Sequence, residues 1–318
     1  MIKIDRYIKE TIQEILEEGS KDKNPRPKDS KGNPAYSRFL TQKVFNYDIS
    51  KGEFPITTLR KTALKGAFYD IEAIYLKQTN IIEEMHPSIH SWWKDFSENM
   101  GGFYSIGQTY GHTVRRFDLM NKLLDGLENN PFSRRHKLNL WQEQEKIDDP
   151  QALEPCAGFT LWSVREVDFT FLYNDCLSRL EEIIPEFKIH PLKREDKSFL
   201  VRYIDLTLIQ RSMDFMMTSS INPTQYVMLG MMVCNHLTFK TGILHKLGNF
   251  THIVQNCHIY DVHINAAKEI LKREPINEQP LIKLNCEPKD FYSHSVDDFE
   301  FKLPKGIQKL KNKLELVV

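Results

Sequence analysis

The sequence predicts a globular protein that mixes helices with strands along one chain. Isoleucines recur at helical spacing through residues 2–18, which predicts an amphipathic helix there. Runs with high strand propensity begin near Arg38, directly after Cys156 and at Leu208. Residues 223–243 are apolar and rich in Met, and they predict a long helix buried in the core.

The segments between these elements can be assigned in chain order. Residues 19–35 are rich in Lys, Pro, Asp and Gly, which is typical of a surface loop. An extended piece begins at Phe54 and leads into a helix with one apolar side. Residues 174–198 predict a helix and a charged loop, and the tail from 275 to 318 contains only short apolar runs.

Composition limits the possible partners. The 318 residues are 41% hydrophobic and 27% charged, and Lys+Arg and Asp+Glu each number 43. A chain with no formal net charge has no general basic field, which argues against nucleic acid as a partner. The charged N-terminus is no secretory signal and no apolar run could cross a bilayer, so we expect no membrane partner and a cytoplasmic location (host cytoplasm if the source is viral).

The cysteines do not suggest a disulfide framework. They are odd in number and far apart, and they form no CxxC pair, which also argues against a metal site. Cys156 follows Pro155 and is expected at a turn that enters a strand. A lone Cys is more often inert and buried than nucleophilic, but a nearby cation such as Arg211 would stabilise its thiolate.

The stretch Leu208–Tyr226 combines an Arg, a Ser, an Asp and an Asn. The planar guanidinium of Arg211 suits a phosphate, and Ser212 can donate a second bond to the same anion. Asp214 and Asn222 could read a ring or a sugar with fixed donors and acceptors. Taken alone, the stretch is better explained as an edge strand that runs into a polar loop.

Two further groups of side chains suit a nucleotide or a flat heterocycle. Trp92, Trp93 and Phe96 are close enough in sequence to form a stacking wall, although dense aromatics are most often core. In a strand, His258 and Tyr260 point to the same face and could lie beside one sugar. Such a pair also serves ordinary packing.

Several short motifs occur in one order along nearly the whole chain. They are FPITT, TN at Thr79–Asn80, YG at Tyr110–Gly111, SRR at Ser133–Arg135, PC at Pro155–Cys156, QRSxD at Gln210–Asp214 and HIYxxH at His258–His263. In this order the motifs resemble the thymidylate synthase family. The resemblance implies an α+β fold, with one large twisted mixed sheet flanked by helices, and a homodimer formed through the sheet face. It also implies a single domain over residues 1–318 with an insertion around 174–198.

The resemblance implies a role for each residue at a matching position. Cys156 falls at the nucleophile, and the implied catalytic set is Cys156, Asp70, Tyr110 and Asp214. The implied substrate ligands are Arg134, Arg135, Arg211, Ser212, Asn222, His258 and Tyr260. The first two arginines would reach the phosphate of the neighbouring subunit, so the dimer would share its active sites. The implied cofactor is 5,10-methylenetetrahydrofolate, contacted by Trp93, Phe96 and Asp214. The arginines would neutralise the phosphate and lower the pKa of the nucleophile.

The chain departs from the family pattern around the base and the folate. Where the family has an Arg in its N-terminal loop this chain has Ser30, for which Lys28 or Lys31 could substitute. The family His that follows the nucleophile is replaced by Ala157. The family's catalytic Glu aligns best with Asp70. A shift of one residue would favour Tyr69, and Glu72 is close by.

The resemblance implies one-carbon transfer to C5 of a pyrimidine nucleoside monophosphate, through a covalent bond between Cys156 and C6. Asn222 favours uracil and therefore dUMP, because an amide offers a donor to O4 and an acceptor to N3–H. The departures near the base favour hydroxymethylation, to 5-hydroxymethyl-dUMP. Methylation to dTMP, hydroxymethylation of dCMP or CMP, and an inactive homologue that binds nucleotide or RNA are the alternatives.

Overall fold

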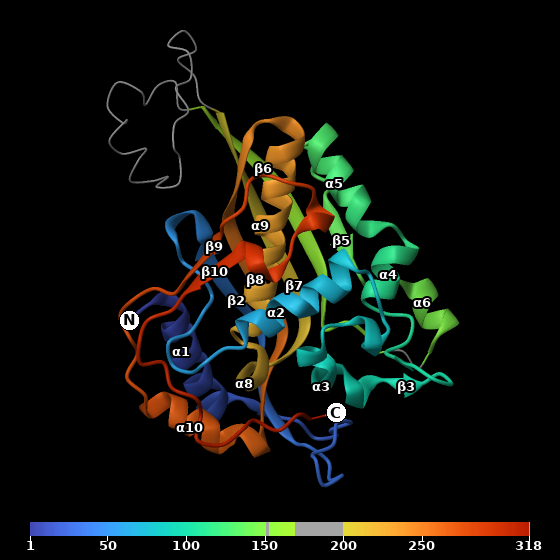
Figure 1. Cartoon of the computed structure of the whole chain (residues 1–318). Coiled ribbons are helices and arrows are strands. Elements are labelled where there is room, and N and C mark those ends of the chain that lie inside the picture. The colour runs from blue at the N-terminus through green and yellow to red at the C-terminus, as the bar shows by residue number, and fades with distance from the viewer. Residues whose placement is uncertain (151–152, 169–199, 318) are drawn as a thin grey trace.

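The structure is a computed structural model that describes residues 1–150, 153–168 and 200–317. A six-stranded mixed sheet forms its centre, in the order β1-β2-β8-β7-β6-β5 (Figure 1). Its strands are β1 (Ser20–Lys21), β2 (Ser37–Asp48), β5 (Lys137–Asn139), β6 (Ala157–Asp168), β7 (Leu200–Asp214) and β8 (Leu244–Tyr260). β7 and β8 run parallel, and every other neighbouring pair is antiparallel. The predicted α+β class, with a large mixed sheet flanked by helices, is confirmed.

The parallel pair is joined by α9 (Ile221–Thr241), which crosses one face of the sheet (Figure 1). The helix is apolar on nearly every side, and its residues from Tyr226 to Leu229 are all buried. Gly242 ends the helix with a φ of 71°, a left-handed conformation that a residue with a Cβ rarely adopts. The buried helix predicted over residues 223–243 is therefore confirmed.

The predicted N-terminal helix is α1 (Lys3–Glu18), which packs on the same core. Its buried apolar residues are Ile4, Ile8, Ile12 and Ile15. The ring of Tyr7 meets the ring of Phe45 on β2 edge to face, with centroids 5.4 Å apart. The predicted strand near Arg38 is β2, and most of residues 19–35 form a loop, as expected.

Shorter elements complete the fold. The other helices are α2 (Leu64–Ile71), α3 (His90–Trp93), α4 (Gly111–Arg116), α5 (Leu119–Asn129), α6 (Glu143–Asp148), α8 (Phe215–Thr218) and α10 (Ile264–Lys272). Two small hairpins pair β3 (Glu98–Asn99) with β4 (Tyr104–Ser105) and β9 (Leu281–Leu284) with β10 (Phe299–Lys302). A π-helical turn, Glu72–Leu76, extends α2. Single 3-10 turns lie at Ile49–Lys51, Ile82–Glu84, Pro87–Ile89, Lys94–Phe96, Asp261–His263, Phe291–Ser293 and Val296–Asp298.

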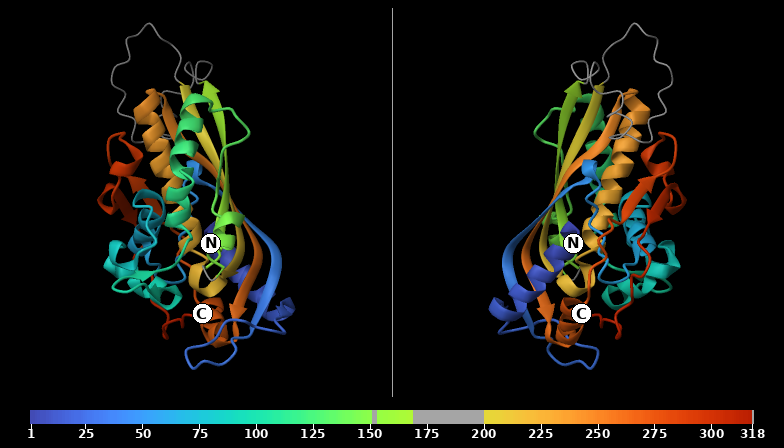
Figure 2. Two further views of the ribbon diagram at one scale, coloured as in Figure 1. Left: turned by 90° about the vertical axis from the view of Figure 1, so that its right-hand side faces the viewer. Right: turned by 90° about the vertical axis from the view of Figure 1, so that its left-hand side faces the viewer.

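The two faces of the sheet differ in how they are covered. Figure 2 shows α9 and α5 on one side and the strands along the other. Along β2, Phe45 and Tyr47 are buried while Val44 and Asn46 point outward, with Val44 47% exposed. On β6, Leu161 is 41% exposed on a strand whose neighbour Trp162 is buried. The outer face therefore leaves apolar side chains in contact with solvent in the single chain.

One prediction from the sequence is wrong. The stretch Leu208–Tyr226 is not an edge strand that runs into a loop, because β7 lies inside the sheet between β8 and β6. It continues into α8 and α9. The polar residues of this stretch thus sit on a rigid central strand and at helix starts. The expected insertion around 174–198 lies outside the described residues. Among the residues described, no helix combines the length and apolarity needed to span a membrane.

Candidate active site

Cys156 lies in the turn that leads into β6, as the sequence predicts, and is half-buried. The adjacent strand supplies Arg211, whose main-chain N–H donates to the Cys156 carbonyl at 2.9 Å. The Arg211 guanidinium donates from Nε to the Pro155 carbonyl at 3.1 Å and from Nη2 to the Glu154 carbonyl at 2.8 Å. These bonds use only some of its N–H donors, so Arg211 holds the cysteine loop and can still bind an anion.

Two arginines act electrostatically on the Cys156 thiol. Burial raises its pKa above the ordinary value, while the charges of Arg211 and Arg26 lower it. Burial outweighs both charges, so the pKa is raised. The two arginines act in the expected direction, but their charges do not bring the pKa of Cys156 below its ordinary value in the single chain.

Tyr110 connects the cysteine loop to an aromatic wall. It is buried and has a φ of 48°, a region that residues other than glycine rarely occupy. Its Oη accepts a hydrogen bond from the main-chain N–H of Cys156 at 3.1 Å. Its ring centroid lies 5.0 Å from that of Trp93, edge to face. The strained turn before α4 thus places a phenol between the thiol loop and an indole.

Asp70, in the last turn of α2, places a buried carboxyl beside Trp93. Its Oδ1 accepts from Trp93 Nε1 at 2.7 Å and its Oδ2 from Gln225 Nε2 at 2.6 Å. Burial raises the pKa of Asp70 to about 6, against the opposite effect of the two hydrogen bonds. Tyr69 instead stacks on a histidine ring, and Glu72 pairs with a lysine at 3.1 Å. Of the three alternatives, only Asp70 lies beside Trp93.

Asn222, at the start of α9, joins the same group through side-chain amides. Its Oδ1 accepts from Gln210 Nε2 at 3.2 Å, and its Nδ2 donates to Gln225 Oε1 at 2.9 Å. Asn222 is half-buried, whereas the two glutamines are 2% and 3% exposed. The one amide of the set that solvent reaches is the residue expected to read the base.

The C-terminal ends of β7 and β8 bring a second group together. The rings of His258 and Tyr260 lie 4.8 Å apart, on the shared strand face that the sequence predicts. His258 Nε2 is buried and has no hydrogen-bond partner among the described residues. Asp214 caps α8 through Oδ1 and lies 3.5 Å from His263 Nδ1 through Oδ2. Burial raises the pKa of Tyr260 to about 12, and among the nearby charges Asp214 adds to the rise.

For some expected site residues within the described ranges, the structure shows no side-chain contact with Cys156, Asp70 or Asn222. Arg134 and Arg135 are exposed, and neither guanidinium makes an ion pair or hydrogen bond within the described part of the chain. Phe96 is half-buried in the turn after α3, and the Ser212 side chain is half-buried on β7. In the N-terminal loop, the main-chain N–H of Ser30 donates to the Glu315 carboxylate. The expected substitutes Lys28 and Lys31 are exposed on the same loop.

Sequence reasoning missed Arg26 and the two glutamines. Arg26, between two prolines, lowers the pKa of both Cys156 and Tyr260 through its charge. The loop pattern favours Lys28 or Lys31 in place of the family arginine, but Arg26 lies two positions before Lys28 on the same loop. Gln225 lies on the buried helix, where an amide among apolar residues was a signal in itself, because buried amides require partners.

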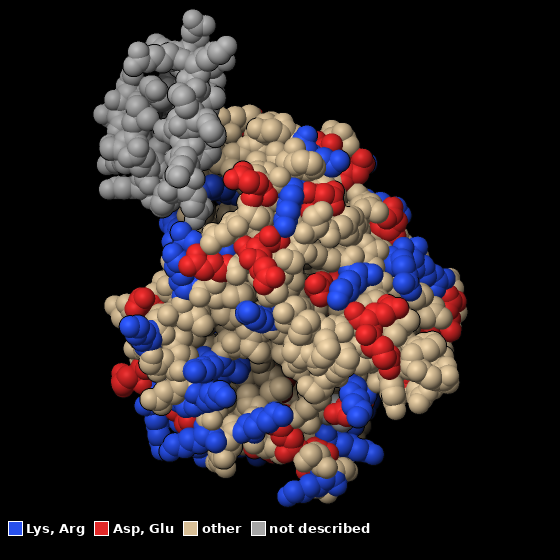
Figure 3. All heavy atoms as spheres, viewed as in Figure 1, with Lys and Arg blue, Asp and Glu red and all other residues tan. Residues whose placement is uncertain are grey.

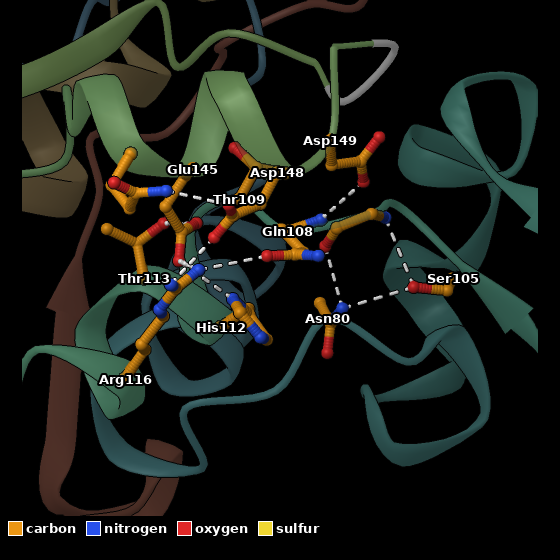
Figure 4. Close-up of polar contacts among 12 residues, drawn as sticks. Asn80, Ser105, Gln108, Thr109, His112, Thr113, Arg116, Glu145, Asp148 and Asp149 are labelled. Atoms are coloured by element: carbon orange, nitrogen blue, oxygen red, sulfur yellow. Dashed lines mark hydrogen bonds and ion pairs between the residues drawn. The ribbon is translucent and has the colours of Figure 1, made fainter.

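A polar cluster, the α4–α6 latch, supports the site from outside. We define it as His112, Thr113, Arg116, Glu145 and Asp148 (Figure 4). Glu145 is buried, accepts from Thr113 Oγ1 at 2.7 Å and lies 3.1 Å from His112 Nδ1. Arg116 Nη2 pairs with Asp148 Oδ2 at 2.7 Å. Since α4 follows Tyr110 and α6 precedes the cysteine loop, the latch links the two segments that meet at Cys156.

The surface charge is local rather than general. Figure 3 shows Lys and Arg side chains gathered in the lower left of the view, over the region of α1 and α10. Elsewhere on this face both signs are interspersed. With a formal net charge of zero, an anion at the site has to be attracted by such local groups.

Comparison with known proteins agrees with this arrangement. A family model described as thymidylate synthase matches residues 6–315. The thymidylate synthase of Streptococcus gordonii is 37% identical over 303 residues, and that of Streptococcus thermophilus is 36% identical over 308, each covering 94% of both chains. The solved structure of thermostable thymidylate synthase A from Bacillus subtilis matches with a TM-score of 0.75 at 26% identity and covers 99% of both chains. The motif resemblance is confirmed: the chain belongs to the thymidylate synthase family and is a folate-dependent one-carbon transferase.

Proposed function

We propose that this chain transfers a one-carbon unit from 5,10-methylenetetrahydrofolate to C5 of dUMP and forms dTMP. One observation carries the proposal: the loop of a half-buried thiol, on which two arginines act, is linked through Tyr110 and Trp93 to a buried carboxyl. That carboxyl is linked in turn, through Gln225, to an amide that solvent reaches. This set supplies a nucleophile, an anion site, a proton carrier and a base reader. The relatives named thymidylate synthase support the methyl product over the hydroxymethyl product.

The Cys156 sulfur is the proposed nucleophile. As a thiolate it adds to C6 of the pyrimidine, which makes C5 electron-rich enough to attack the one-carbon unit. Arg211 and Arg26 would hold the phosphate and stabilise the thiolate. The pKa of this thiol is raised in the single chain, so further positive charge is needed.

We propose that the missing charge comes from Arg134 and Arg135 of a second copy. Both side chains are exposed and unpaired within the described residues, as the expected reach into a neighbouring subunit requires. The outer sheet face, with exposed Val44 and Leu161, is the surface proposed to pair the two copies. A C2 dimer of this kind has two identical shared sites.

The sugar and base would be read by fixed polar groups. Asn222 keeps one N–H and one lone pair beyond its two glutamine bonds, which suits O4 and N3–H of uracil. The unpartnered His258 Nε2 and the Tyr260 hydroxyl are the proposed ligands of the deoxyribose hydroxyl. Ser212 would add a donor to the phosphate.

Methylenetetrahydrofolate, when bound, supplies the one-carbon unit and the hydride that reduces it. The residues present fit this co-substrate, because Trp92, Trp93 and Phe96 are half-buried aromatics that can stack on a flat ring, and Trp93 donates to the carboxyl of Asp70. With a pKa of about 6, Asp70 can accept or donate a proton near neutral pH. Tyr110 would orient the reacting centre through the cysteine loop.

A hydroxymethyl product is the second candidate. Asp70 is one methylene shorter than the family Glu and Ala157 lacks an imidazole, and both changes leave room for water at C5. Incubation with dUMP and methylenetetrahydrofolate separates the candidates. We expect dTMP and dihydrofolate in equal amounts. Formation of 5-hydroxymethyl-dUMP without dihydrofolate would overturn the methyl product.

A further inference from the structure

A continuous chain of side-chain hydrogen bonds links the catalytic carboxyl to the base-reading amide. It runs from Asp70 through Gln225, Asn222 and Gln210 to His252, where Gln210 Oε1 lies 2.8 Å from His252 Nε2. Each distance along it is between 2.6 and 3.2 Å. All members except Asn222 are buried.

The direction of this amide chain follows from its ends. A carboxylate only accepts, so the group of Gln225 that faces Asp70 has to be its NH2 and the group that faces Asn222 its oxygen. Asn222 then turns its NH2 toward Gln225 and its oxygen toward Gln210. At the far end Gln210 Nε2 also donates to the main-chain carbonyl of Ser212 at 2.9 Å, which fixes the same direction independently.

Reversal of Asn222 is therefore opposed on both sides. A flipped amide would set Nδ2 against Gln210 Nε2 and Oδ1 against Gln225 Oε1, which places two donors and two acceptors face to face. Buried amides that lose their partners in this way are strongly disfavoured. The same argument makes His252 a donor from Nε2, and burial lowers its pKa to about 3, so the ring is neutral.

The fixed direction decides which base is read. Uracil presents an acceptor at O4 and a donor at N3, whereas cytosine presents a donor at N4 and an acceptor at N3. Only a reversed amide matches cytosine at these two atoms. We propose that Gln225 is a specificity-determining positioning residue, which holds Asn222 in the uracil-reading orientation by bonding it to the Asp70 carboxylate. This inference rests on the proposed function and names the residue that sets its substrate.

The test is nucleotide binding by Gln225→Met, which keeps the length of the side chain and removes both hydrogen bonds. Calorimetry with dUMP and dCMP, in the absence of folate, gives the ratio of the two dissociation constants. We expect the preference for dUMP to fall about tenfold, because one of the two restraints on Asn222 is lost. Gln13→Met on α1 is the matched control and keeps the wild-type ratio, because this glutamine is exposed and its side chain bonds Glu17 on the same helix.

A second variant, Gln225→Glu, tests separately the contact of residue 225 with Asn222 and its contact with Asp70. It keeps an acceptor for Asn222 and places a second carboxyl against Asp70. The titratable groups that act on Asp70 from the other elements are the phenols of Tyr75, Tyr110 and Tyr226, all with raised pKa and neutral near pH 7. We expect the preference for dUMP over dCMP to persist. Because a second carboxyl raises the pKa of Asp70, we expect the pH profile for release of tritium from dUMP labelled at C5 to move to higher pH.

The outcomes distinguish the inference from the function on which it rests. A Gln225→Met protein that binds both nucleotides more weakly, with an unchanged ratio, overturns the specificity role and leaves the proposed function intact. If that variant does not fold, Gln225→Glu decides: an unchanged pH profile of tritium release would show that residue 225 does not act on Asp70, which overturns the inference. A wild-type protein that does not prefer dUMP to dCMP overturns the proposed substrate itself.

Discussion

Asp70 combines a proposed role in proton transfer with a cost in stability. It has hydrogen-bond partners on both oxygens, yet burial holds its pKa at about 6, well above the ordinary value. A group whose pKa is higher in the folded state favours folding most below its unfolded pKa. That contribution is lost as the pH rises through about 6.

Asp70→Asn removes this titration, so a comparison of the variant with the wild type shows how much the titration of Asp70 contributes to stability. We expect the wild type to lose about 1 kcal/mol of unfolding free energy relative to Asp70→Asn between about pH 5 and about pH 8. Urea unfolding of both proteins at the two pH values measures the difference. Parallel curves for the two proteins would show that Asp70 titrates as an exposed carboxyl does. Enzyme activity of the variant should be low at both values, since the proton carrier is gone.

At Cys156, the positive charges within one chain do not offset the effect of burial on the pKa of the thiol. Two arginines act on the thiol, yet burial keeps its pKa above the ordinary value. Further positive charge near the sulfur would lower this pKa and favour the thiolate. In the proposed dimer, Arg134 and Arg135 of the second copy would supply that charge.

At the scale of elements, the site depends on segments that meet only through the fold. β7 places Arg211 beside the cysteine loop, and α9 directs Gln225 toward Asp70 on α2 and Asn222 toward Gln210 on β7. The α4–α6 latch joins the helix that follows Tyr110 to the helix that precedes the loop of Cys156. Its central member, Glu145, is buried with partners on both oxygens.

Glu145→Gln tests the latch. The change removes a buried charge from its partners, and we expect a loss of about 1–3 kcal/mol in unfolding free energy, with reduced turnover as the cysteine loop loosens. Glu143→Gln, exposed on the same helix, is the control and should change stability by less than about 0.5 kcal/mol. Equal effects of the two substitutions, measured by urea unfolding, would contradict a structural role for the latch.

At the scale of the whole molecule, the proposed dimer completes each site. It predicts complementation between two inactive variants, Cys156→Ser and the double variant Arg134→Ala with Arg135→Ala. In a mixed dimer, one site combines an intact cysteine with intact arginines of the other chain. Co-refolded mixtures should recover about a quarter of wild-type activity, as random pairing into C2 dimers predicts. A mixture as inactive as its parents would mean that each chain holds a complete site.

The sequence was most informative where periodicity or motif order constrained it. Three predictions were correct: helix α1 from its isoleucine spacing, helix α9 from its apolar run, and the turn at Cys156 from the proline before it. Each depends on local pattern and burial. The central position of β7 was not predictable from its own residues, since the order of strands depends on pairing with distant segments. The apolar surroundings of Gln225 indicate a buried amide, but its partner Asp70, like the thiol loop on which Arg26 acts, is far away in sequence and could not be predicted.

The central claim is that Cys156 adds to C6 of dUMP and so activates C5. The most direct measurement is the release of tritium from dUMP labelled at C5, in the presence of methylenetetrahydrofolate, by the wild type, Cys156→Ser and the control Cys286→Ser. We expect release by the wild type and by Cys286→Ser, and a fall of at least about 10³-fold in Cys156→Ser. Release that persists in Cys156→Ser, or no release by the wild type, would contradict the account.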